Sequence, residues 1–173
     1  DSPRLSADRL EYTIGNARLV FHCPEAELKR IFDDLLVGKN EEGVDELYFA
    51  HTETADAFTQ LSLRQSEWFV SDDDRFSMQY LADLLREAQQ RGVLTVDDLY
   101  LDEPHVIGLL LSDPVIAACW RDYRRITGTQ SGAEKSEGTY AVKVAAKKRS
   151  IDPLVQMNDG LRRFTTVNAD YAS

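Results

Sequence analysis

Apolar residues recur at helical spacing over most of this 173-residue chain, and this periodicity limits the fold to a mainly helical one. The pattern is clearest after residues 71–74, where one face carries Phe76, Tyr80, Leu81, Leu84, Leu85 and Ala88. Ser71 and the three aspartates after it suit a helix N-terminus, and Gly92 suits the position just past a C-terminus. We therefore expect a long helix between Ser71 and Gly92.

The same signals predict further helices on both sides of this one. We expect helices over residues 5–21, capped by Ser6, over 24–38, opened by Pro24 and ended by Gly38, and over 53–69. A short helix should begin at the capping-box spacing of residues 95–98, and two more at Pro104 and Pro114, the last reaching Gly128. Residues 47–50 fit either an extended segment or the start of a helix.

The pattern changes after residue 127. Residues 128–138 are rich in Gly, Ser, Thr, Glu and Lys and predict a loop, because they can bury little apolar surface. Tyr140, Val142 and Val144 alternate with other residues and predict a strand, and residues 158–160 (Asn-Asp-Gly) predict a turn. The expected organisation is a helical region over 1–127, a flexible loop over 128–138 and a small β-containing segment over 139–173.

Charge and composition exclude several classes of function. The net charge of −10 argues against general nucleic-acid binding, because the average surface repels phosphate. The chain has no uninterrupted apolar run of roughly 18 to 20 residues, the length that a membrane span needs, and no export signal opens it. We expect Cys23 and Cys119 to be reduced core residues of a cytoplasmic protein.

Residues 8–12 (Asp8-Arg9-Leu10-Glu11-Tyr12) place a carboxylate, a base and a phenol within about one and a half helical turns. Taken alone, these residues fit ordinary helix chemistry, in which Asp8 complements the helix dipole and Tyr12 packs against a neighbour. Their order, however, is similar to a segment of the HD-superfamily metal-dependent phosphohydrolases. Those enzymes bind a divalent metal through a His, a His-Asp pair and a distant Asp, and the distant Asp begins such a helix.

The resemblance implies that the chain is the C-terminal part of such an enzyme, with part of an HD-like helical bundle and a small C-terminal β element. It implies that Asp8 is the last metal ligand and that Tyr12 faces the substrate, a phosphate ester or nucleotide. The implied cofactor is Mn²⁺, Mg²⁺, Fe²⁺ or a similar ion, which polarises phosphoryl oxygens and activates water. A later stretch, Lys147-Lys148-Arg149 followed by Ile151-Asp152-Pro153, also resembles this family and makes those three cations candidate substrate contacts.

Two departures from the family pattern limit this prediction. Gly15-Asn16 stands where the nucleoside-triphosphate triphosphohydrolase branch has Arg-Asp, so deoxynucleotide specificity is not implied. The upstream His and His-Asp ligands would lie before Asp1, and His22, His51 and His105 are isolated. We expect the chain alone to be inactive, to bind metal weakly, and to need the preceding part of the same protein as its partner.

The competing hypothesis is a non-catalytic helical module that binds a protein partner through its acidic surface or its basic C-terminal residues. Those basic residues are Lys143, Lys147, Lys148, Arg149, Arg162 and Arg163, and they fit either an anion-collecting surface or a solvated strand face. Self-association of this chain, such as homo-oligomerisation, would favour the enzyme-fragment hypothesis, because a cut HD domain exposes the apolar face of its first helix, whereas a stable monomer would favour the module. We find no phosphate-binding glycine loop, nucleophile elbow, paired-cysteine zinc pattern or calcium loop, and we assign the acids at 72–74 and 97–103 to helix starts.

Overall fold

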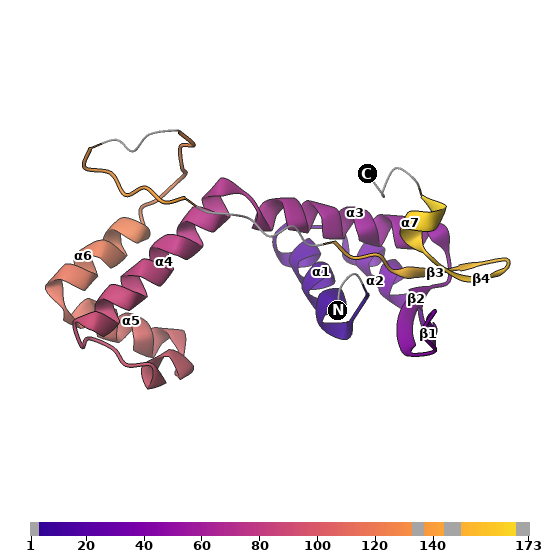
Figure 1. Ribbon diagram of the computed structural model, residues 1–173, viewed down its shortest axis with the longest axis horizontal. Coiled ribbons are helices and arrows are strands. Elements are labelled where there is room, and N and C mark those ends of the chain that lie inside the picture. The colour runs from indigo at the N-terminus through magenta and orange to yellow at the C-terminus, as the bar shows by residue number, and fades with distance from the viewer. Residues whose placement is uncertain (1–3, 133–136, 144–149, 169–173) are drawn as a thin grey trace. The chain divides into compact units, whose positions relative to one another are not determined.

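The computed structural model describes residues 4–132, 137–143 and 150–168, and these are mainly helical with a small four-stranded sheet (Figure 1). They form two compact units. Unit 1 contains the described residues 4–69 and 150–168, and unit 2 contains residues 70–132 and 137–143. Within those described ranges, no helix has the length and apolar character needed to cross a lipid bilayer. Cys23 belongs to unit 1 and Cys119 to unit 2, and both are free thiols.

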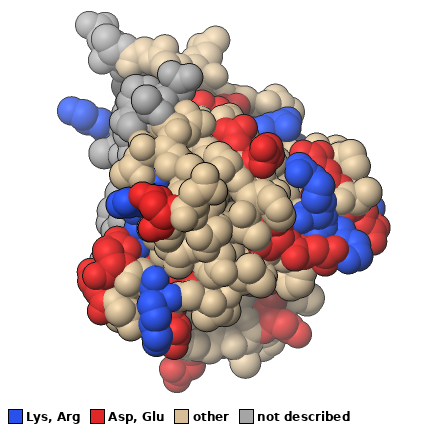
Figure 2. Space-filling model, turned by 90° about the vertical axis from the view of Figure 1, so that its right-hand side faces the viewer, with Lys and Arg blue, Asp and Glu red and all other residues tan. Residues whose placement is uncertain are grey.

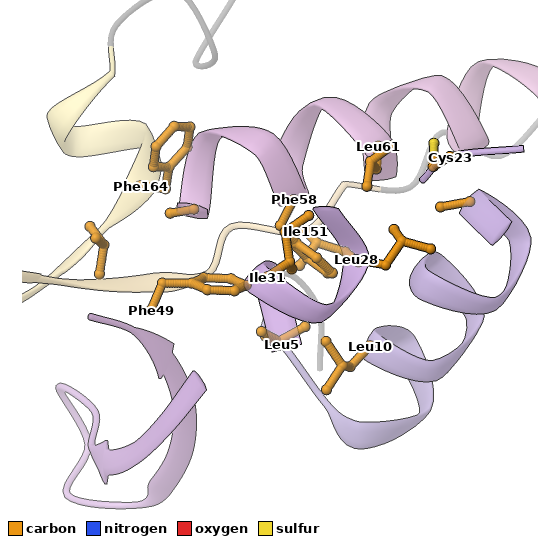
Figure 3. Close-up of a cluster of buried hydrophobic side chains, with 13 residues drawn as sticks. Leu5, Leu10, Cys23, Leu28, Ile31, Phe49, Phe58, Leu61, Ile151 and Phe164 are labelled. Atoms are coloured by element: carbon orange, nitrogen blue, oxygen red, sulfur yellow. The ribbon is translucent and has the colours of Figure 1, made fainter. Parts of the chain in front are cut away.

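Unit 1 contains three helices of more than one turn: α1 (Ala7–Leu19), α2 (Glu25–Asp33) and α3 (Thr52–Phe69). The predicted cap is confirmed, since the Ser6 hydroxyl accepts a hydrogen bond from the Arg9 N–H. The helix predicted over 53–69 is confirmed as α3. The buried side chains of these helices join those of the sheet and of the C-terminal segment in one core (Figure 3), formed by Leu5, Leu10, Ala17, Cys23, Leu28, Ile31, Phe49, Ala55, Phe58, Leu61, Ile151, Val155 and Phe164.

The turn between α1 and α2 is unusual because a histidine occupies the left-handed backbone region. His22 has a φ of 54°, and it lies inside a bond in which the Cys23 N–H donates to the Ala17 carbonyl six residues back. A residue with positive φ just after a helix is most often glycine, because a side chain is strained there. The turn reverses the chain and brings buried Cys23 back to buried Ala17.

The prediction of a helix over 24–38 is wrong beyond Asp33, where the chain becomes extended. β1 (Leu35–Lys39) pairs antiparallel with β2 (Asp45–Phe49), so residues 47–49 are extended and Ala50 leads toward α3. The turn between the strands explains the change, because the Asn40 side chain accepts hydrogen bonds from the N–H groups of Glu42 and Val44. A short run of apolar residues fits a helix and a strand equally well, so the sequence around Leu35 did not reveal the hairpin.

The C-terminal hairpin completes the sheet. β3 (Leu154–Met157) and β4 (Gly160–Arg163) are joined by the predicted turn, and the sheet order is β1-β2-β3-β4. β3 lies parallel to β2, with Tyr48 opposite Leu154 and Phe49 opposite Val155. A single helical turn, α7 (Phe164–Val167), follows β4. The small β element at the C-terminus is therefore part of a sheet that also includes β1 and β2.

Unit 2 is a set of capped helices, α4 (Asp72–Gln90), the 3-10 turn η1 (Asp97–Tyr100), α5 (Glu103–Ser112) and α6 (Pro114–Tyr123). Ser71 caps α4 as expected, Asp102 and Asp113 cap the helices predicted to begin at Pro104 and Pro114, and Thr95 and Asp98 form the predicted reciprocal pair at the start of η1. α6 ends at Tyr123, before the predicted Gly128. Unit 2 has its own core, which contains Leu84, Ala88, Leu94, Leu110 and Ile116.

The predicted strand over Tyr140–Val144 is wrong for residues 140–143, which have no regular structure, and Val144 lies outside the described residues. The Tyr140 ring packs edge-on against Tyr80 and Phe76 of α4, at centroid distances of 4.7 and 5.4 Å. Its hydroxyl donates to the Asp83 carboxylate at 2.6 Å. Because this aromatic contact with a helix is available, Tyr140 does not need a strand partner.

Candidate functional site

Asp8 and Tyr12 lie one helical turn apart on the exposed side of α1, opposite the buried Leu10, Thr13 and Ala17. Asp8 is exposed in the first turn, and Tyr12 is 59 % exposed. The Asp8 carboxylate has no hydrogen-bond or ion-pair partner in the part of the chain that the structure describes. The packing of α1 thus leaves both side chains free to contact another group.

Metal ligands do not converge on Asp8 within unit 1. Across residues 4–132, 137–143 and 150–168, no three His, Cys, Asp or Glu side chains are placed to hold a metal ion. Asp8 would therefore need additional ligands to form a divalent-cation site, since one carboxylate binds such an ion weakly.

Two of the three histidines pair with carboxylates. The His51 ring Nδ1 contacts Asp34, which also accepts the His51 backbone N–H at 3.0 Å, and this carboxylate raises the pKa of His51. His105 Nε2 lies 3.6 Å from Asp98. His22 lies with a positive φ in the turn that follows α1, so each histidine has a local structural role that sequence spacing alone did not reveal.

The predicted cationic contacts Lys147, Lys148 and Arg149 lie outside the described residues. The other cations of that group divide into two kinds. Lys143 is exposed, whereas Arg162 pairs with Asp159 and Arg163 pairs with Glu41 and Glu46. On the face of the molecule drawn in Figure 2, blue and red side chains lie beside one another. Arg162 and Arg163 are thus neutralised by carboxylates of the same chain.

Arg163 forms the most buried ionic cluster among the described residues. Its guanidinium donates to Glu46 at 2.7 and 2.9 Å and to Glu41 at 3.0 Å, and also to the Asp152 carbonyl at 3.0 Å. The Arg163 side chain is 14 % exposed and that of Glu46 only 3 %. Such two-pronged arginine–carboxylate geometry is the strong form of an ion pair. Burial of this kind makes the loss of either partner costly.

Glu46 connects three segments that are distant in sequence. Besides Arg163 of β4, its carboxylate accepts hydrogen bonds from the Asn40 side chain at 3.0 Å and from the backbone N–H of Leu5. Burial alone would raise the pKa of Glu46, but the hydrogen bonds from Arg163 and Asn40 outweigh it and hold the pKa below its ordinary value. Glu46 therefore remains ionised and fixes the chain just before α1.

Arg4 extends this cluster toward the start of α1. It contacts Glu42 at 2.5 Å and lies 3.9 Å from Glu46, while its carbonyl accepts a hydrogen bond from the Arg9 side chain at 3.1 Å. An open cavity of about 450 Å³ lies between residues 4–7 and the β1–β2 hairpin. Its walls are partly apolar, formed by Leu5, Ala7, Val37 and Leu47. The turn that carries Asp8 is thus held next to a cavity by ionic contacts.

No local pattern in the sequence indicates this cluster. Glu46 stands in an ordinary alternating stretch, and its main partner is 117 positions away. Because the sheet brings this acid and its cation together from distant positions, their spacing in the sequence does not indicate that they pair. Comparison with known protein families, with curated proteins and with solved structures gave no match to this chain.

Proposed function

We propose that this chain is the C-terminal portion of an HD-superfamily metal-dependent phosphohydrolase that acts on a phosphate ester or nucleotide. The observation that carries the proposal is the placement of residues 8–12 in the first turns of α1. Leu10 is buried and anchors the helix, while Asp8 and Tyr12 remain exposed one turn apart. In this proposal unit 1 is part of an HD-like helical bundle.

Each exposed residue has a defined chemical role. The Asp8 carboxylate is an anionic oxygen ligand of the kind that Mg²⁺ and Mn²⁺ prefer, and a bound ion of this type polarises a phosphoryl oxygen. The Tyr12 hydroxyl donates a hydrogen bond to a phosphate oxygen of the substrate. Lys147, Lys148 and Arg149 are the cations proposed for the substrate's negative charge. Arg162 and Arg163 are excluded from this role because their charges are already paired.

The remaining ligands, a His and a His-Asp pair, come from residues that precede this chain in the same protein. The exposed position of Asp8 at the beginning of α1 supports this arrangement, because another segment can reach its carboxylate without displacing a partner. The 173-residue chain by itself should then bind Mn²⁺ only weakly and hydrolyse no phosphate ester.

The test uses the whole polypeptide made by the source cell, with Asp8→Asn as the variant and Glu11→Gln as the matched control on the same exposed helix. We expect Asp8→Asn to remove most of the bound Mn²⁺ and to lower phosphatase activity roughly 100-fold or more, since a ligand is lost. Glu11→Gln should change both quantities less than about twofold. Unchanged Mn²⁺ content in Asp8→Asn, or no activity with Mn²⁺ or Mg²⁺ in the unsubstituted protein, would contradict the proposal.

A second candidate function, a non-catalytic interaction module, is favoured by the surface around η1. Val96, Leu99, Tyr100 and Leu101 are between 44 % and 85 % exposed, and Tyr100 is the most exposed of them. Adjacent exposed apolar side chains of this kind mark protein contacts. This candidate becomes the better hypothesis if Asp8→Asn leaves metal content and activity unchanged.

A further inference from the structure

One face of α4 receives a side chain from the segment that follows α6. Tyr140 packs its ring edge-on against Phe76 and Tyr80 of α4, at centroid distances of 5.4 and 4.7 Å. Its hydroxyl donates a hydrogen bond to the Asp83 carboxylate at 2.6 Å. Residues 76, 80 and 83 are four and three positions apart, so they lie on the same face of the helix. Two aromatic rings and an anionic acceptor thus contact one phenol.

The Tyr80 ring is held in place by α6 independently of Tyr140. It stacks on Tyr123 at a centroid distance of 5.8 Å and an interplanar angle of 19°. Its hydroxyl donates to the Cys119 carbonyl at 3.4 Å. Neither contact involves Tyr140, so this aromatic wall is formed before a phenol binds to it.

The Asp83 carboxylate is also oriented by other residues. Its Oδ1 accepts hydrogen bonds from the Gln79 side chain at 2.9 Å and from the Arg86 guanidinium at 2.6 Å. Its Oδ2 accepts the bond from the Tyr140 hydroxyl. Because Gln79 and Arg86 fix one oxygen, the other is directed at the phenol without a further cost of ordering the acceptor.

The occupant of this site comes from a segment outside the helices and strands. Residues 140–143 have no regular structure, and the Tyr140 side chain is 39 % exposed. Its ring and hydroxyl make the contacts with α4 described above. Tyr140 can therefore leave the site without breaking a bond inside any helix.

We propose that this face of α4 is a binding site for a tyrosine side chain of another polypeptide, and that Tyr140 occupies it as an internal competitor. The occupant itself gives the ligand chemistry, because it is a phenol carried on a peptide backbone. An external tyrosine meets the same two rings and the same carboxylate. It binds only to molecules from which Tyr140 has left, so its apparent affinity for the unsubstituted chain is reduced.

The inference does not depend on the proposed phosphohydrolase activity, and its test needs only the 173-residue chain. The probe is the peptide acetyl-Gly-Thr-Tyr-Ala-Val-amide, which copies residues 138–142, and binding is followed by NMR titration. Tyr140→Ala empties the site, so this variant should bind the peptide with a Kd of about 1 mM, at least about tenfold more tightly than the unsubstituted chain. A peptide with Phe in place of Tyr should bind roughly fivefold more weakly, because it cannot donate to Asp83.

Two further substitutions in the Tyr140→Ala chain test the acceptor. Asp83→Ala should remove the preference for the tyrosine peptide over the phenylalanine peptide. Glu87→Ala is the matched control, because Glu87 is an exposed acid one turn further along α4, and it should retain that preference.

Circular dichroism checks that each variant is folded. Should Tyr140→Ala not fold, Tyr140→Phe decides, because it keeps the ring but removes the competing donor, and it should bind the tyrosine peptide roughly threefold more tightly than the unsubstituted chain. A folded variant that does not bind the tyrosine peptide more tightly than the unsubstituted chain, or that binds both peptides equally, would overturn the inference.

Discussion

Unit 2 and unit 1 are stabilised by contacts of very different sequence range. In unit 2, α4, α5 and α6 each begin at a capping side chain that bonds to a backbone N–H two or three residues later. In unit 1, β2 pairs with β3 about a hundred residues further on, and Arg163 bonds to acids 117 and 122 positions away. Local signals can therefore specify most of unit 2, whereas unit 1 depends on its C-terminal segment.

The largest expected effect comes from breaking the buried cluster of unit 1. Arg163→Ala leaves Glu46 buried without its cation and should lower the free energy of unfolding of unit 1 by about 3 kcal/mol or more. The two tryptophans separate the units, because Trp68 lies in unit 1 and Trp120 in unit 2. Arg163→Ala is made in two variants that each retain one tryptophan, and urea unfolding is followed by fluorescence. The unfolding midpoint reported by Trp68 should fall, and the midpoint reported by Trp120 should not change.

Arg162→Ala is the control for this substitution, because the neighbouring Arg162 pairs with Asp159 at the surface. Its loss should cost less than about 1 kcal/mol. Equal effects of the two substitutions would show that the buried cluster does not stabilise unit 1.

The second largest loss of stability is expected at Gly38, where the Tyr48 ring lies close to the backbone of β1. A Cβ at Gly38 would lie 2.9 Å from a ring carbon of Tyr48, so Gly38→Val should destabilise unit 1 by about 2 kcal/mol. Gly15→Ala is the matched control, since nothing lies within 4 Å of that position in α1, and it should stabilise the unit by up to about 1 kcal/mol. Thermal unfolding followed at Trp68 measures both.

Acid should affect unit 1 through Glu46. Its pKa is lowered in the folded state, so the stability it contributes is present above the unfolded-state pKa near 4.5 and is lost as the pH falls. Between the two pKa values the loss is at most about 1.4 kcal/mol for each pH unit. The slope of unit 1 stability against pH, measured from about pH 5 downward, should be smaller in Glu46→Gln than in the unsubstituted chain. Identical slopes would contradict this role.

In unit 2, one residue outside the helices should have a measurable effect. Tyr140→Phe keeps the ring contacts with Phe76 and Tyr80 but removes the hydrogen bond to Asp83, and it should cost about 1 kcal/mol at Trp120 with no change at Trp68. An equal change at both tryptophans would show that the two units do not respond independently.

The smallest effect is a stabilisation. His22→Gly relieves a side chain from the left-handed region at φ 54° and should stabilise unit 1 by roughly 0.5 kcal/mol, visible as a higher midpoint at Trp68. A lower midpoint would mean that the His22 side chain contributes more than its backbone strain costs.

The sequence predicted elements whose signals are local. The helix over 53–69, the helix after Ser71, the capping residues and the turn at 158–160 are confirmed. Two predictions failed where distant contacts decide the structure. Leu35 and Leu36 fit a helical stripe, but the Asn40 turn and β2 hold them as a strand, and Tyr140 packs on α4 instead of entering a sheet.

The residues of the candidate site also divide into those with local sequence signals and those that depend on distant contacts. The Asp8 and Tyr12 positions on an exposed helix could be predicted from local order, although their chemical roles stay predictions. Glu46 could not be predicted, because its contacts arise only when the turn after β1, β4 and the residues before α1 come together. Local sequence therefore indicates where an exposed helix residue such as Asp8 lies, while distant pairing holds the start of that helix in place.

The most direct test of the central claim, that Asp8 is one ligand of a larger metal site, is the intact mass of the polypeptide made by the source cell. We expect a mass well above 19.6 kDa, with a His and a His-Asp pair in the residues that precede Asp1. A mass equal to that of this chain would contradict it, because the other ligands would then have no source.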